Sequence, residues 1–135
     1  MSYDDDNVFA KILRGEIPNR TVLENEHVLA FHDISQKAPT HVLVIPKGKY
    51  VSFDDFAANA GDAEIVAFVR AAGQVASDEG VAPSGGGEGF RIISNSGKNG
   101  VQEVPHFHLH VLGGRWLGQM LKKAEDSAST LDGGR

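Results

Sequence analysis

The chain has 135 residues and a formal net charge of −5, with 41% apolar and 23% charged residues. This length suits one domain that buries a core without cross-links, and the composition is that of an ordinary globular protein. The acidic balance argues against a nucleic-acid polymer or an anionic membrane as partner, and the absence of cysteine excludes disulfide and thiolate chemistry.

The first seven residues, MSYDDDN, are acidic where a secretory signal peptide has a basic start followed by an apolar run. No apolar stretch approaches the length needed to span a bilayer. We therefore expect a cytoplasmic protein.

The first half of the chain predicts a short helix and three strands. Asp6 or Asn7 can cap a helix whose apolar residues recur on one face and which ends at Gly15. A hairpin follows, and then a run rich in β-branched residues that should lie at the centre of a sheet. The strands are expected at residues 21–24, 28–33 and 41–46.

The second half predicts one long helix over residues 62–79, because its apolar residues form a single stripe and Gly80 can end it. Residues 52–55 resemble only a capped first helical turn. Two more strands are expected at 89–95 and within 104–114. Short links between strands favour antiparallel pairing, so we predict an α+β domain with a five-stranded antiparallel sheet, one short helix and one long helix. The domain should comprise residues 1–118, with 119–135 as a mobile or loosely packed tail.

Histidines occupy every second position at His106, His108 and His110, with apolar residues between them. This is the period of a strand, so the three imidazoles should share one face, while Phe107, Leu109 and Val111 face a core. At a rise of about 3.3 Å per residue, neighbouring imidazoles would lie roughly 7 Å apart.

Three interpretations of this histidine strand remain open on the residues alone. The histidines could be surface or partly buried residues without a role. They could be ligands of a zinc ion, although no carboxylate within the strand is placed to orient them. They could also divide the tasks of nucleophilic catalysis, since neutral imidazole attacks phosphorus and changes protonation near neutral pH.

The segment His106-Phe107-His108-Leu109-His110-Val111-Leu112 resembles the signature of the histidine-triad nucleotide-binding proteins, in which histidines alternate with apolar residues. Further segments resemble the phosphoramidase branch of that family, and together they cover residues 7–118. These segments are Lys11-Ile12-Leu13-Arg14-Gly15-Glu16-Ile17-Pro18, Ala30-Phe31-His32-Asp33-Ile34, Ala38-Pro39-Thr40-His41-Val42-Leu43-Val44-Ile45-Pro46 and Gly113-Gly114-Arg115.

The resemblance implies a homodimer whose sheet continues across both subunits, and a hydrolase that needs no cofactor and no metal. His108 matches the nucleophile that attacks the phosphorus of a purine nucleoside 5′-phosphoramidate and forms a nucleotidyl-histidine intermediate, from which water releases AMP or GMP. His110 would contact the phosphate or the leaving group. His106 and His41 would orient the nucleophile and relay a proton to the departing amine.

The resemblance also implies a nucleotide site. Asp33 would accept hydrogen bonds from the ribose hydroxyls, with a turn cap or a solvent-exposed residue at the hairpin end as the alternative. The purine slot would comprise Ile34, Phe9, Ile12 and Leu43, apolar residues that any core could use. The phosphate-binding turn would comprise Asn95, Gln102 and the backbone at Val101 and Glu103, with a plain turn role as the alternative for Asn95.

The chain departs from the branch pattern at three points near this turn. Val101 stands where glycine is frequent, Glu103 where a hydroxyl is common, and Pro105 where an aromatic or aliphatic residue is usual. Trp116 directly follows Arg115, in a region that helps to select the leaving group. Two alternatives therefore remain: a dinucleoside polyphosphate hydrolase of the same superfamily, and a nucleotide-binding adaptor with vestigial turnover.

Overall fold

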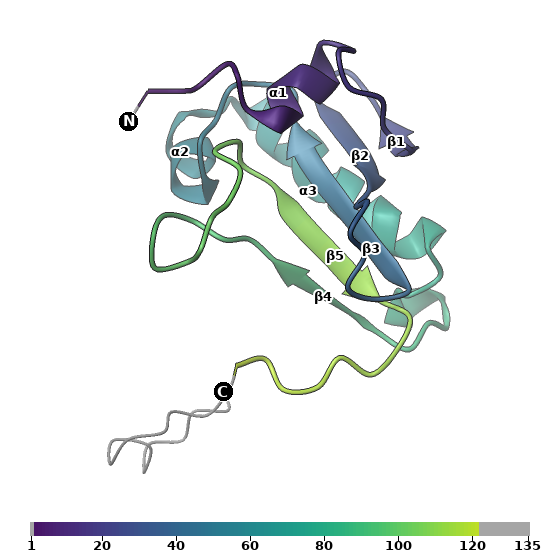
Figure 1. Cartoon of the computed structure of the whole chain (residues 1–135). Helices are drawn as coiled ribbons and strands as arrows, with labels where there is room; N and C mark the ends of the chain where they lie inside the picture. Colours follow the sequence, from purple (N-terminus) through teal and green to yellow (C-terminus); the bar gives the residue numbers. More distant parts are fainter. Residues whose placement is uncertain (1, 122–135) are drawn as a thin grey trace, which may run out of the picture.

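The computed structural model describes residues 2–121 and contains one five-stranded antiparallel sheet (Figure 1). The strand order is β1-β2-β3-β5-β4, so the central position predicted for the third strand is confirmed. The predicted α+β class is confirmed as well. The strands are β1 (Thr21–Glu24), β2 (Val28–His32), β3 (Thr40–Pro46), β4 (Phe90–Ile93) and β5 (Leu109–Gly113).

Within residues 2–121, three α-helices accompany the sheet, one more than the sequence predicted. These are α1 (Val8–Leu13), α2 (Phe53–Asn59) and α3 (Asp62–Asp78), with a short 3₁₀ turn at Pro83–Gly85. The predicted cap of α1 is Asn7, whose side chain accepts the Ala10 N–H at 2.9 Å. The predicted turn at 52–55 extends into α2 because Phe56 packs against the rings of Phe68 and Phe107, contacts distant in sequence that a local pattern does not reveal.

One face of the sheet is covered and the other is partly covered, which explains why β3 is apolar from Val42 to Pro46 and buried at every residue. Helix α3 packs on one face, where its apolar stripe meets Val42, Val44 and Val111. Helix α1 covers part of the other face, where Phe9 packs against Phe31 and Leu43. Figure 1 shows α3 behind the sheet and α1 near its upper end.

The histidine segment is only partly a strand, which corrects the prediction. Strand β5 begins at Leu109, so His106 and His108 precede it in irregular backbone. The alternation nevertheless persists, since Phe107, Leu109 and Val111 pack in the core beside α3. The rings of His108 and His110 lie closer than an ideal strand would place them, with centroids 5.1 Å apart.

Within residues 2–121, no helix is both long and apolar enough to cross a membrane. The predicted tail begins with Gln119, Met120 and Leu121, which are exposed and belong to no helix or strand. Its remainder, residues 122–135, lies outside the described residues.

Candidate active site

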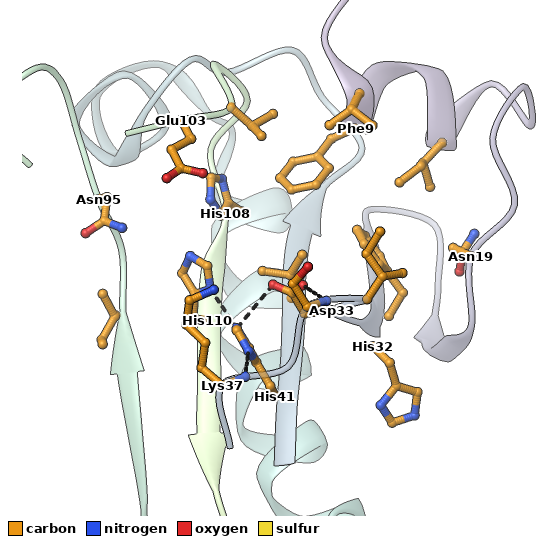
Figure 2. A pocket seen from close by; sticks show the side chains of 18 of the residues that line it. Phe9, Asn19, His32, Asp33, Lys37, His41, Asn95, Glu103, His108 and His110 are labelled. Atoms are coloured by element: carbon orange, nitrogen blue, oxygen red, sulfur yellow. Dashed lines mark hydrogen bonds and ion pairs between the residues drawn. The ribbon is translucent and has the colours of Figure 1, made fainter. Parts of the chain in front are cut away.

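A cavity of about 630 Å³ opens on the face of the sheet that α1 partly covers (Figure 2). Its volume is within the range of small-molecule sites. The cavity brings together every predicted site residue except His106 and Gln102: Phe9, Ile12, Asp33, Ile34, His41, Leu43, Asn95, Val101, Glu103, His108 and His110. Segments far apart in sequence therefore converge on one space.

The imidazole of His108 is held by the backbone in one tautomer. Its Nδ1 lies 2.7 Å from the carbonyl oxygen of His106, and a carbonyl only accepts, so Nδ1 carries the proton. Burial lowers the pKa of His108, which keeps the ring neutral at pH 7. Among the described residues, every buried side-chain nitrogen or oxygen has a hydrogen-bond partner. Nε2 of His108 has no such partner, so this atom is not buried. Nε2 must therefore reach the cavity, with its lone pair free to attack.

The rings of His41 and His110 are hydrogen-bonded to each other, and their tautomers are fixed as well. The backbone N–H of Lys37 donates to Nδ1 of His41 at 3.1 Å, so Nε2 of His41 carries the proton. That nitrogen donates to Nδ1 of His110 at 2.9 Å. Nδ1 of His110 is then an acceptor, and its proton is at Nε2, which by the same reasoning faces the cavity. Burial, with His108 and His41 nearby, lowers the pKa of His110 to about 4.

The carboxylate of Asp33 lies beside this pair. Oδ2 of Asp33 is 3.3 Å from Nε2 of His41, and Oδ1 accepts the backbone N–H of Ser35 at 2.7 Å. Burial lowers the pKa of His41, and the negative charge of Asp33 opposes that effect. The contact between Asp33 and His41 was not predicted. It joins the proposed ribose acceptor to the histidine pair.

The two predicted residues outside the cavity both support it from behind. The ring of His106 is fully buried, and its Nε2 lies 2.8 Å from the carbonyl of Pro46, so the ring itself does not touch the cavity. Gln102 donates from Nε2 to the carbonyls of Val51 and Val104, while its Oε1 accepts the Gly97 N–H. Gln102 thus braces the turn before β5.

The apolar residues of the predicted purine slot belong to the core and the cavity at once. Phe9 packs with Leu43 and Ile12 in the cluster under α1. Its ring also stands edge-on to His108, with centroids 4.9 Å apart. Ile34 differs because its side chain is 97% exposed at the rim. Figure 2 shows Phe9 directly facing His108 across the upper part of the cavity.

The turn before β5 supplies the far wall. Val101 has a left-handed backbone (φ 57°), the conformation that makes glycine frequent at such positions, and it is the one non-glycine residue with positive φ among residues 2–121. The exposed side chain of Glu103 extends toward His108, and its charge opposes the effect of burial on the pKa of His108. Asn95 lies on β4's side of the histidines, away from Asp33.

Sequence reasoning missed several residues that line the cavity, including Lys37 and Asn19. Lys37 acts on His41 through its backbone N–H, which no side-chain pattern announces. His32 also lines the cavity, and Figure 2 shows its ring extending away from the carboxylate of Asp33.

Among the residues that the structure describes, part of this set could hold a metal ion. Asp33, His41 and His110 each offer a ligand atom, and these atoms lie within 4.8 Å of one another. In the structure the same atoms are hydrogen-bonded to each other, so none is left without a partner. The absence of a metal requirement stays a prediction.

An α+β domain whose sheet carries a cavity lined by histidine and carboxylate side chains defines a class of protein, and this class corresponds to a known family. The HIT domain model matches residues 14–117, and the chain belongs to the HIT domain family. An uncharacterized HIT-like protein of Azospirillum brasilense is 58% identical over 90% of this chain and 97% of its own length. The purine nucleoside phosphoramidase of Escherichia coli is 41% identical over 87% and 94% of the two chains.

Solved structures agree with this assignment. A HIT family hydrolase from Clostridium thermocellum has a TM-score of 0.77 and 37% identity, covering 87% of this chain and 99% of its own. A HIT family hydrolase from Legionella pneumophila has a TM-score of 0.72 and 40% identity, covering 84% and 96%. Together these relatives support hydrolase activity as the general class of reaction.

Proposed function

We propose that this protein hydrolyses purine nucleoside 5′-phosphoramidates to the nucleoside monophosphate and an amine. The observation that carries the proposal is that hydrogen bonds fix the tautomers of His108 and His110. His108 thereby presents a lone pair at Nε2, and His110 an N–H at Nε2, to the same cavity. A nucleophile beside a hydrogen-bond donor is what displacement at phosphorus requires. The similarity to the Escherichia coli phosphoramidase supports the same substrate class.

The nucleotide binds with its ribose at Asp33 and its purine among Phe9, Ile12, Leu43 and Ile34. A carboxylate accepts two hydroxyl hydrogen bonds well, and the exposed Ile34 can close on a ring from the rim. The phosphate lies between His108 and the turn that contains Val101 and Glu103. The Val101 N–H already donates to the Lys98 carbonyl within this turn. The Glu103 carboxylate extends toward His108 in Figure 2, so it would have to turn away when the phosphate binds.

In the first step, Nε2 of His108 forms a bond to phosphorus and the phosphorus–nitrogen bond breaks. The departing nitrogen accepts a proton from Nε2 of His110. The anionic phosphate favours protonation of neighbouring imidazoles, so the substrate complex holds an added proton on the His41–His110 pair, which Asp33 stabilises. In the second step, water attacks phosphorus, the bond to His108 breaks, and the proton lost by water returns to the pair.

The functional unit is a homodimer joined at β4. This strand is at the end of the sheet, and its exposed side chains include Phe90 and Ile92. An unpaired edge that carries apolar side chains favours pairing with a second copy. We expect Ile92→Lys to yield monomers by light scattering, while Thr21→Lys on the opposite edge strand leaves the dimer intact. A monomeric parent protein would contradict this assembly.

Turnover of adenosine 5′-phosphoramidate and of diadenosine polyphosphates should be compared in the parent protein, in His108→Ala and in a control, His27→Ala. His27 lies in the turn between β1 and β2, away from the cavity residues. We expect the phosphoramidate to be the better substrate, with turnover abolished only in His108→Ala. A preference for the dinucleotides would instead favour a polyphosphate hydrolase, and binding without turnover of either would favour an adaptor.

A further inference from the structure

The ring of His106 is buried completely, so both of its nitrogens need partners within the protein. Nε2 donates to the carbonyl of Pro46 at 2.8 Å, which leaves Nδ1 as an acceptor. The hydroxyl of Tyr3 lies 2.5 Å from Nδ1 and is its donor. Burial lowers the pKa of His106 to about 4 and raises the pKa of Tyr3, so at neutral pH the ring is neutral and the hydroxyl keeps its proton.

The segment that carries Tyr3 is tied to the body of the domain. Lys49 forms an ion pair with Asp5 at 2.8 Å, and its Nζ lies 6.0 Å from the centroid of the Tyr3 ring. Arg14 donates to the carbonyl of Asp5 at 2.9 Å. Tyr3 precedes the region that the HIT domain model matches, which starts at residue 14. The Tyr3 side of this contact therefore lies outside the residues that the domain model matches, while the His106 side lies within them.

His106 is joined to the nucleophile through its backbone. Its carbonyl accepts the Nδ1 proton of His108 at 2.7 Å, the bond that fixes the lone pair of His108 at Nε2. The ring of Phe9 packs edge-on against both imidazoles, with centroids 6.3 Å from His106 and 4.9 Å from His108. A shift of His106 as a whole would thus move the carbonyl that holds His108 and disturb the shared packing against Phe9.

We infer that Tyr3 is a positioning residue: its hydroxyl fixes the tautomer and orientation of His106, and through the His106 carbonyl the orientation of His108. This inference rests on the proposed function only for its effect on rate. Because Tyr3 does not line the cavity, removing its hydroxyl should lower kcat and leave substrate affinity nearly unchanged.

The test compares Tyr3→Phe with Tyr50→Phe. Each variant removes one phenolic hydroxyl that has a hydrogen-bond partner, but the hydroxyl of Tyr50 bonds to the carboxylate of Glu64 and not to a histidine. With adenosine 5′-phosphoramidate we expect kcat of Tyr3→Phe to fall on the order of tenfold, as for other small displacements of a reacting group. KM should stay within about twofold, and Tyr50→Phe should keep the parent kcat.

Nitrogen-15 NMR of the histidine rings, without substrate, tests the same contact directly. In Tyr3→Phe the Nδ1 resonance of His106 should move toward that of a free, unprotonated ring nitrogen, and the Nδ1–H signal of His108 should broaden or shift. Unchanged histidine spectra, an unchanged kcat, or an equal kcat loss in Tyr50→Phe would overturn the inference. If the parent protein does not hydrolyse the phosphoramidate, the proposed function fails, and the NMR comparison alone decides the role of Tyr3.

Discussion

Replacing Val101 tests whether the turn beside the nucleophile stores backbone strain. Val101 has φ 57° and a side chain that is 67% exposed, so it adopts the left-handed conformation with little packing to compensate. That conformation costs a residue with a Cβ atom roughly 1–2 kcal/mol. Glycine avoids the cost but adds about 0.5–1 kcal/mol of backbone entropy in the unfolded chain. We therefore expect Val101→Gly to be more stable than Val101→Ala by about 0.5–1 kcal/mol.

Urea unfolding of the two variants at pH 7.5 measures this difference, since both lose the same γ-methyl groups and differ only in the remaining Cβ. The matched control is Ala57→Gly, an exposed position in the middle of α2. There the order should reverse, with the glycine variant less stable by about 0.5–1 kcal/mol. A Val101→Ala variant as stable as Val101→Gly, or more so, would refute the strain.

Three further predictions concern the site. Asp33→Asn should weaken AMP binding on the order of tenfold by calorimetry, because a charged hydrogen-bond acceptor for the ribose is lost; an unchanged affinity would remove Asp33 from the ribose site. Dialysis against a chelator should leave turnover unaltered, whereas activity lost on chelation and restored by zinc would establish a metal enzyme. Burial lowers the pKa of His106 from 6.5 to about 4, so its contribution to stability is complete above pH 6.5 and falls by up to about 3 kcal/mol as the pH drops toward 4. Urea midpoints should fall less steeply over this range in His106→Gln, and equal slopes would contradict the assignment.

Local patterns predicted most of the fold because they depend on neighbouring residues. Residues close together in sequence predicted the Asn7 cap, the hairpin of β1 and β2, and the apolar run of β3. The alternation around His108 likewise predicted which side chains enter the core. For α2 the sequence predicted only a single helical turn. The rings that pack against Phe56 come from α3 and the histidine segment, and a local pattern does not reveal them.

The site divides in the same way. Motif resemblance identified about half of the cavity residues, the histidines and Asp33 among them, but not the hydrogen bonds that set the histidine tautomers. The donor to His41 is a backbone N–H, the orienting group of His108 is a carbonyl, and neither has a side-chain signature. The partner of His106 is Tyr3, which is more than a hundred residues away in sequence. Such contacts follow from the folded geometry and not from spacing.

A brief reaction with a purine nucleoside phosphoramidate, quenched without acid and analysed by mass spectrometry, tests the central claim most directly. We expect a nucleotidyl mass on the peptide that contains His108, and we expect both this mass and turnover to be absent in His108→Ala. Turnover that survives in His108→Ala, or an adduct that maps to another residue, would contradict His108 as the nucleophile.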